Sequence, residues 1–217
     1  MKKRTFVSTL LAVALVGMAG ISPAQAQQAA VAGRDYVEIK PAQPADVPGK
    51  IEIVEFFSYG CIHCSDFHPI VSKWAMKLPA DVVFKRVPVS FGRAQWRNLS
   101  KLYYSAEALG ELGKLDNAAF AAIHQKGVKL YDDGTIAEFA AQQGVDARKF
   151  ADAYGSFGVQ SKVQRADQMT NAYKVQGTPS IAVDGKYMVL SEGIGGWDDY
   201  LARVDRVIAK ARGERKK

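Results

Sequence analysis

Residues 55–64 read Glu55-Phe56-Phe57-Ser58-Tyr59-Gly60-Cys61-Ile62-His63-Cys64. The apolar run Ile51–Phe57 predicts a buried strand, and it ends at a turn that contains Gly60. Helix-compatible residues begin at the first cysteine. The stretch therefore predicts a strand, a turn, and then a Cys-x-x-Cys motif at the start of a helix.

The position of this motif gives its two cysteines different chemistry. The first turn of a helix has backbone N–H groups without intrahelical partners and the positive end of the helix dipole, and both stabilise a thiolate. We therefore predict that Cys61 has a lowered pKa and is the sulfur that attacks and is attacked. Cys64 lies one turn further along the helix, so we expect it to be more buried and to be the resolving cysteine. Strand, turn and motif together predict a thioredoxin-like redox site.

The first 26 residues have the features of a secretory signal peptide. Basic residues 2–4 precede the apolar run 6–19, and Ala24-Gln25-Ala26 forms a cleavage site with small residues. The apolar run is too short for a comfortable membrane span, and Pro23 disfavours the competing interpretation of an uncleaved anchor. We expect the mature chain to begin near Gln27. Cleavage removes three basic and no acidic residues, so the formal charge of +7 falls to +4.

Export changes what the cysteines can mean. The chain has only 2 cysteines, and both lie in the motif. A structural disulfide is possible in an oxidising compartment, but a bridge over so short a loop constrains the unfolded chain very little. We therefore favour the redox interpretation. Much of the remaining positive charge lies in the tail 210–217, which we interpret as a solvated end and not as a nucleic-acid-binding arm.

The predicted elements form an α/β fold with a helical insertion. The spacing predicts strands over 36–39, 51–57 and 82–89, with a helix over 61–77 between the second and third, and a hairpin over 180–190 that turns at Asp184-Gly185. A last helix is predicted over 197–211. Residues 93–173 show helical periodicity almost throughout. We predict a discontinuous domain of residues 36–92 and 174–212, with residues 93–173 inserted as an all-helical domain.

The element order, the stretch 55–64 and Gly177-Thr178-Pro179-Ser180 ahead of the hairpin resemble the DsbA family of periplasmic thiol:disulfide oxidoreductases. The resemblance covers nearly all of the mature chain. It implies a thioredoxin-like fold, a periplasmic location and Cys61 as the reactive cysteine. It also implies that Pro179 is preceded by a cis bond and, with Thr178, faces the disulfide and binds substrate. Ile62 stands where the family more usually has proline, which leaves the reduction potential open.

His63 lies between the cysteines, where the redox potential is set. Its side chain can carry positive charge near the Cys61 sulfur and stabilise the thiolate, which makes the disulfide a stronger oxidant. The alternative is an exposed bystander. We interpret the other two histidines, His68 and His124, as packing or surface residues.

Glu55 is a carboxylate inside an otherwise apolar strand. A central parallel strand is buried on both faces, so Glu55 should be desolvated and its pKa raised, although simple alternation could also place it in solvent. The resemblance implies that an acid at this position lies behind the active site near a lysine, and Lys85 in the next strand fits. We interpret Glu55, assisted by Lys85, as the proton acceptor for the Cys64 thiol.

Several other functions are less well supported by the sequence. A c-type haem site needs histidine directly after the second cysteine, where Ser65 stands. A zinc site would have to recruit His63 or His68 to a single cysteine pair. A disulfide isomerase or reductase remains a possible function, because a threonine before this proline, as Thr178 is here, also occurs among isomerases of this fold. Isomerases of that kind usually carry an added dimerisation domain, and residues 27–50 are too few to form one. A chaperone-like binding module for unfolded exported chains is the alternative from another class.

The sequence thus predicts a monomeric, exported dithiol oxidase. It would donate the Cys61–Cys64 disulfide to newly exported cysteine-containing proteins through a mixed disulfide, without a metal or an organic cofactor. By resemblance, a DsbB-like membrane quinone reductase would reoxidise it.

Overall fold

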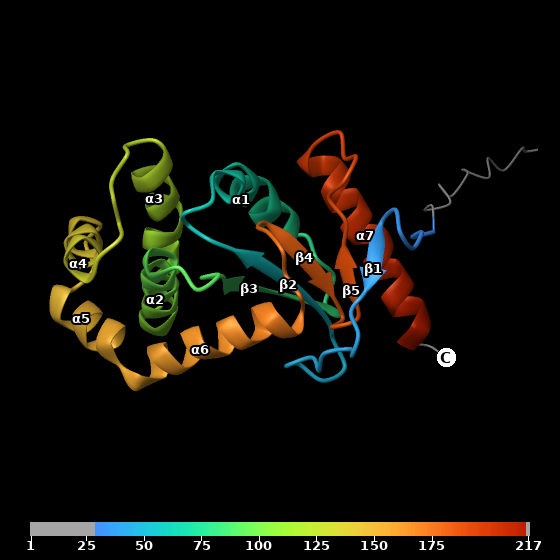
Figure 1. Ribbon diagram of the computed structural model, residues 1–217, viewed down its shortest axis with the longest axis horizontal. Helices are drawn as coiled ribbons and strands as arrows, with labels where there is room; N and C mark the ends of the chain where they lie inside the picture. Colours follow the sequence, from blue (N-terminus) through green and yellow to red (C-terminus); the bar gives the residue numbers. More distant parts are fainter. Residues whose placement is uncertain (1–28, 216–217) are drawn as a thin grey trace, which may run out of the picture.

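The computed structural model describes residues 29–215, so the predicted signal peptide 1–26 lies outside the described residues. Within this range one sheet contains five strands in the order β1-β5-β4-β2-β3 (Figure 1). No helix of the described range is long and apolar enough to span a membrane. The strands are β1 (Tyr36–Glu38), β2 (Ile51–Phe57), β3 (Val82–Pro88), β4 (Ser180–Val183) and β5 (Tyr187–Val189).

Strand β2 lies inside the sheet and leads directly to the Cys-x-x-Cys motif. It pairs in parallel with β3 and antiparallel with β4, and all of its residues are buried. Because successive side chains of a strand point to opposite faces, Glu55 lies on the same face as Ile51 and Ile53. Glu52 and Val54 lie on the other face. This alternation decides which charged groups can meet behind the motif.

Helices cover both faces of the sheet. Residues of α1 (Ile62–Ala75) and α7 (Trp197–Arg215) pack with Ile51, Ile53 and Ile181 in one hydrophobic cluster. On the other face, Val54 and Phe56 belong to a second cluster that extends into the helical segment. Figure 1 shows this segment at one end of the sheet, with its last helix running back below the strands. Its helices are α2 (Ala94–Leu109), α3 (Leu112–His124), α4 (Asp133–Gln142), α5 (Ala147–Gly155) and α6 (Phe157–Ala172).

The predicted fold class is confirmed. The predicted strand 51–57 agrees with β2. The predicted hairpin 180–190 contains β4 and β5 and turns at Asp184 and Gly185, which both have positive φ (56° and 64°). The division into residues 36–92 with 174–212 and an inserted domain 93–173 stays a prediction. Residues 94–172 contain the five helices between β3 and β4, and they share the second hydrophobic cluster with the sheet.

Candidate active site

Cys61 is the N-cap residue of α1 and has an extended backbone (φ −99°, ψ 120°). Strand β2 and the turn 58–60 carry it to the end of the sheet. Its side chain is partly buried, and both cysteines are free thiols in this structure. The turn is tightly packed, because a Cβ at Gly60 would lie only 2.6 Å from the indole nitrogen of Trp96. Sequence and packing together therefore place one sulfur at an accessible helix N-terminus.

The surroundings of Cys61 lower the pKa of its thiol to about 5. A hydrogen bond with the Cys64 thiol contributes most, partial burial opposes it, and a hydrogen bond from the Thr178 side chain comes next. The backbone N–H groups of Cys64 and His63, in the first helical turn, add smaller contributions. A thiol with this pKa is a thiolate at neutral pH.

Cys64 lies in a contrasting environment. Its side chain is fully buried in the cluster that contains Phe56 and Phe57. Burial raises the pKa of its thiol far above the ordinary range, and the hydrogen bond and negative charge of Cys61 raise it further. Glu55 also acts in this direction. One sulfur of the motif is thus an accessible thiolate and the other a buried thiol.

The loop before β4 faces Cys61 across the fold. The Thr178–Pro179 peptide bond is cis. The Sγ atom of Cys61 lies 3.2 Å from the carbonyl oxygen of Thr178, and both loop residues are partly exposed. A groove of about 440 Å³ runs beside this loop and is lined mainly by residues 174–180 and 188–192. Backbone that is accessible beside a reactive sulfur can pair with an extended peptide.

Glu55 is completely buried, and its charged partner is Arg86. The Nε atom of Arg86 donates a hydrogen bond to Oε2 of Glu55 at 2.8 Å. Burial raises the pKa of Glu55, the charge of Arg86 lowers it, and the charge of Asp116 raises it again. The carboxylate therefore lies behind the motif, held by an arginine.

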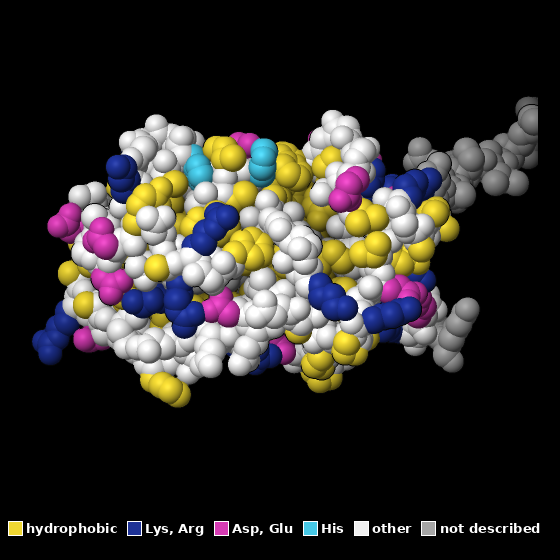
Figure 2. Space-filling model, in the orientation of Figure 1, with side chains coloured by type: hydrophobic (Ala, Val, Ile, Leu, Met, Phe, Trp, Pro, Cys, Tyr) yellow, Lys and Arg dark blue, Asp and Glu magenta, His cyan; other side chains and the backbone are white. Residues whose placement is uncertain are grey.

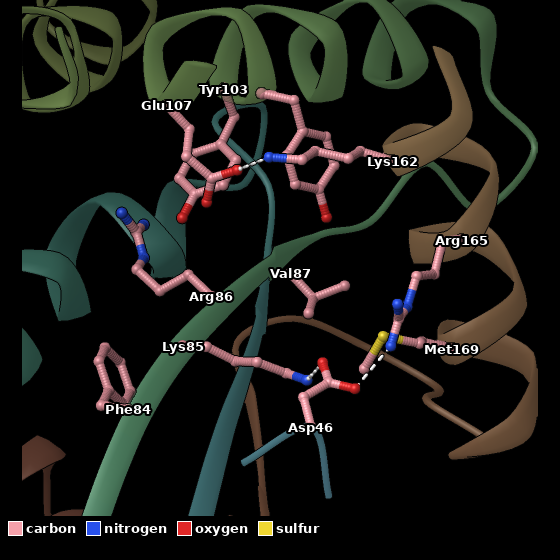
Figure 3. Close-up of a pocket in the computed structure, with 11 residues that line it drawn as sticks. Asp46, Phe84, Lys85, Arg86, Val87, Tyr103, Glu107, Lys162, Arg165 and Met169 are labelled. Atoms are coloured by element: carbon pink, nitrogen blue, oxygen red, sulfur yellow. Dashed lines mark hydrogen bonds and ion pairs between the residues drawn. The ribbon is translucent and has the colours of Figure 1, made fainter. Parts of the chain in front are cut away.

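The predicted role of Lys85 as the partner of Glu55 is wrong. Lys85 pairs with Val54 in the register of β2 and β3, whereas Arg86 pairs with Glu55, so alternation turns the lysine to the opposite face of the sheet. Its Nζ atom lies 2.7 Å from Asp46 and 2.9 Å from Glu52. Figure 3 shows Lys85 directed at Asp46, while the Arg86 guanidinium points away from this pair.

His63 and Ile62 form the outer side of the motif. Both are exposed, Ile62 by 49%. The His63 side chain has no hydrogen bond with any described residue, so any effect on Cys61 must come from its charge. In Figure 2, histidine and hydrophobic side chains lie together on the surface over α1. This arrangement leaves the motif open to a partner.

Four residues beside the motif were not recognised in the sequence as site residues: Tyr59, Arg86, Asp116 and His124. The hydroxyl of Tyr59 donates to Asp116 at 2.6 Å, and Arg86 donates to the same carboxylate at 2.6 Å. His124, interpreted above as a packing or surface residue, has its Nε2 atom 2.7 Å from the carbonyl oxygen of Tyr59. The contacts of Asp116 and His124 with Tyr59 join positions 57 and 65 residues apart in the sequence, so no local pattern could indicate them.

The sequence profile of the family described as "DSBA-like thioredoxin domain" matches residues 52–200. The chain belongs to this family. The match begins in β2 and ends in α7, so it includes the motif, the helical segment and the Thr178–Pro179 loop.

Relatives of the DsbA family match along nearly the whole chain. A "Thiol:disulfide interchange protein DsbA" of Bordetella parapertussis is 43% identical over 98% of this chain and 100% of its own length. The protein of the same name from Pseudomonas aeruginosa is 38% identical over 96% and 99%. The crystal structure of Pseudomonas aeruginosa DsbA has a TM-score of 0.82 and 40% identity, and the match covers 86% of this chain and 97% of that one.

These comparisons confirm the predicted enzyme class. The chain is a thiol:disulfide oxidoreductase of the DsbA family. The roles of Cys61, Cys64, His63, Glu55, Thr178 and Pro179 stay predictions. Among residues 29–215, no group of three or more His, Cys, Asp or Glu side chains is arranged to hold a metal ion.

Proposed function

We propose that this protein is a periplasmic, monomeric dithiol oxidase that transfers its Cys61–Cys64 disulfide to newly exported cysteine-containing proteins. The opposite environments of the two thiols are the observation that carries the proposal. A thiolate at Cys61, with a pKa of about 5, stabilises the reduced pair. A stabilised reduced form makes the disulfide a strong oxidant, because it lowers the free energy of the product of the reaction.

The reaction needs only sulfur chemistry and one proton. A substrate thiolate attacks Sγ of Cys61 in the disulfide; the Cys61–Cys64 bond breaks, and the Cys64 sulfur leaves and takes up a proton. A second substrate thiolate then attacks the substrate sulfur of the mixed disulfide, and Cys61 leaves as a thiolate. The substrate loses two electrons and the cysteine pair gains them. Glu55, buried behind the motif, is the candidate that supplies the proton to Cys64 and accepts it again.

The Thr178–Pro179 loop and the groove beside it provide the substrate-binding surface. An extended peptide that pairs with the backbone at Thr178 would bring its cysteine against Cys61, whose Sγ atom lies 3.2 Å from the Thr178 carbonyl oxygen. Backbone pairing does not depend on side chains, which suits an enzyme that oxidises many proteins. A DsbB-like membrane quinone reductase would restore the disulfide by the same exchange chemistry.

Equilibration of the purified protein with glutathione buffers tests the proposal. We expect the Cys61–Cys64 couple to be more oxidising than glutathione, and the oxidised protein to introduce disulfides into a reduced, unfolded protein. A reducing potential, or efficient repair of scrambled disulfides without net oxidation, would favour the reductase or isomerase alternative. A variant with both cysteines changed to serine separates the chaperone-like alternative, because a binding module would retain its activity.

A further inference from the structure

One face of α3 holds the turn that carries the reactive cysteine. Asp116, Phe120 and His124 are spaced four residues apart, so they lie on the same side of the helix, and all three contact Tyr59. Asp116 accepts a hydrogen bond from the Tyr59 hydroxyl at 2.6 Å, the Phe120 ring packs edge-on with its centroid 5.0 Å away, and His124 binds the Tyr59 carbonyl oxygen at 2.7 Å. The inserted segment therefore reaches to within two residues of Cys61.

Asp116 uses its two oxygens in different directions. Oδ1 accepts from Tyr59, while Oδ2 accepts from Nη1 of Arg86 at 2.6 Å. Nε2 of His68 lies 3.3 Å from the same Oδ2 atom. The Asp116 side chain is 18% exposed, so these contacts are poorly screened by water. A single carboxylate thus connects the active-site turn with the charged groups behind the motif.

The guanidinium of Arg86 is shared between two carboxylates. Nε donates to Glu55 at 2.8 Å and Nη1 donates to Asp116 at 2.6 Å. Within residues 29–215, Nη2 of Arg86 and Oε1 of Glu55 are buried and have no hydrogen-bond partner. Glu55 therefore receives one hydrogen bond from an arginine that could form a bidentate pair with a single carboxylate.

The sharing of Arg86 between Glu55 and Asp116 keeps the pKa of Glu55 higher than it would be if Arg86 faced Glu55 alone. Burial raises the pKa of Glu55 and Arg86 lowers it, but the negative charge of Asp116 raises it again. Burial lowers the pKa of Arg86, but the charges of Glu55 and Asp116 outweigh it and raise the pKa, so the arginine stays charged. Without Asp116, one positive charge would face Glu55 alone, and Glu55 would lose its proton at a lower pH.

We propose that Asp116 is a positioning residue of the disulfide exchange: by dividing Arg86 between two carboxylates, it keeps Glu55 able to hold the proton that Cys64 takes up. This inference rests on the proton-transfer role of Glu55 in the proposed function. When the Cys61–Cys64 bond breaks, protonated Glu55 gives its proton to the Cys64 sulfur and becomes a carboxylate; in the reverse direction the Cys64 thiol returns it.

The groups around this cluster leave few other sources of charge. His68 is buried close to Arg86, and both the burial and the positive charge of Arg86 lower the pKa of its imidazole. The neighbouring phenols have raised pKa values and stay neutral near pH 7. The titratable and charged groups that face Glu55 or its two charged partners are Cys64 and His68 from α1, Arg86 from β3, Tyr103 from α2, Asp116 from α3, Tyr200 from α7, and Tyr59 from the turn.

The test follows the carboxyl signal of Glu55 by NMR in the reduced full-length mature protein, with isotopically labelled glutamate and Glu55→Gln for assignment. We expect Asp116→Asn to lower the midpoint of the Glu55 titration by about one pH unit, and Asp116→Glu to restore it. Asp66→Asn is the matched control, because Asp66 is an exposed carboxylate on α1. An unchanged midpoint in Asp116→Asn, or an equal shift in Asp66→Asn, overturns the proposal.

A rate measurement separates this inference from the proposed function. In Asp116→Asn, the pH profile for oxidation of a reduced test peptide should move to lower pH by the same amount as the Glu55 midpoint, since the acid form of Glu55 then exists only at lower pH. Tyr59→Phe removes the other hydrogen bond of Asp116 and should leave the Glu55 midpoint unchanged; a shift there overturns the division of Arg86 as the cause. If the wild-type protein oxidises no peptide at any pH, the proposed function fails, whatever the Glu55 titration shows.

Discussion

Cys61 and Cys64 are three residues apart in the sequence and lie in opposite environments. Cys61 is partly exposed at the N-terminus of α1, where N–H groups and neighbouring hydroxyl and thiol groups lower the pKa of its thiol to about 5. Cys64 is buried one turn later among apolar side chains, and burial raises the pKa of its thiol. The comparison shows that one helical turn is enough to separate an accessible nucleophile from a protected thiol, because the exposed N-terminus of α1 and the hydrophobic core lie one turn apart.

The largest expected effect comes from removing each of the two sulfurs in turn. Cys61→Ser should abolish disulfide transfer to a reduced protein, because the attacked sulfur is missing. With oxidised glutathione added as the oxidant, Cys64→Ala should accumulate a mixed disulfide with substrate through Cys61, since no second sulfur of the motif can release it. Mass spectrometry of the trapped complex after proteolysis identifies the linked cysteine. A complex trapped through Cys64 in the Cys61→Ser variant, at the level seen for Cys61, would reverse the assignment.

Replacing Arg86 disturbs the buried charges behind Cys64. Arg86→Met leaves Glu55 buried without its positive partner, and we expect the free energy of unfolding to fall by about 3–5 kcal/mol at neutral pH. The deficit should shrink as the pH falls, because protonated Glu55 needs no counter-charge. The folded-state pKa of Glu55 is already raised by burial, and loss of Arg86 raises it further above the unfolded value, so its contribution to stability is lost as the pH rises through that folded-state value.

Chemical denaturation at several pH values measures this effect. Arg97→Met is the matched control, because Arg97 is an exposed arginine (47%) in an ion pair with Asp167 and should lose about 1 kcal/mol or less. An Arg86→Met variant that is as stable as Arg97→Met would show that Glu55 does not depend on its ion pair.

A smaller effect is expected on the exposed side, at His63. Its imidazole has no hydrogen bond with the described residues, so only its positive charge can stabilise the Cys61 thiolate. We expect His63→Gln to raise the pKa of Cys61 by up to about one unit and to make the disulfide less oxidising. Thiolate absorbance as a function of pH measures the shift. An unchanged pKa would mean that backbone groups and neighbouring side chains act alone, and that His63 is a bystander.

The exposed side of this site and the burial of Glu55 could be predicted from the sequence, but the charged partners of Glu55 could not. The order of Phe57, Gly60 and Cys61 sets a strand, a turn and a helix start, and local geometry then determines the environment of the first sulfur. The partner of Glu55 depends on the register of β2 against β3. A shift of one residue in that register exchanges Lys85 for Arg86, and no local pattern fixes it. Asp116 comes from a helix of the inserted segment, so only the folded chain brings it to the site.

The central claim is that Cys61 is a thiolate and Cys64 a thiol in the reduced protein at neutral pH. Since an unfolded cysteine has a pKa of about 8.5, this thiolate stabilises the reduced native state above that pH, and its contribution is lost as the pH falls through about 5. Reduction of the disulfide then takes up one proton above pH 5 and two below it.

The pH dependence of the reduction potential tests this claim most directly. Each proton taken up with the two electrons lowers the potential by about 30 mV per pH unit. We predict a slope of about 60 mV per pH unit below a break near pH 5, and of about 30 mV per pH unit from there to pH 8. A slope that stays near 60 mV per pH unit up to about pH 8 would contradict the account, because both sulfurs would then be protonated thiols.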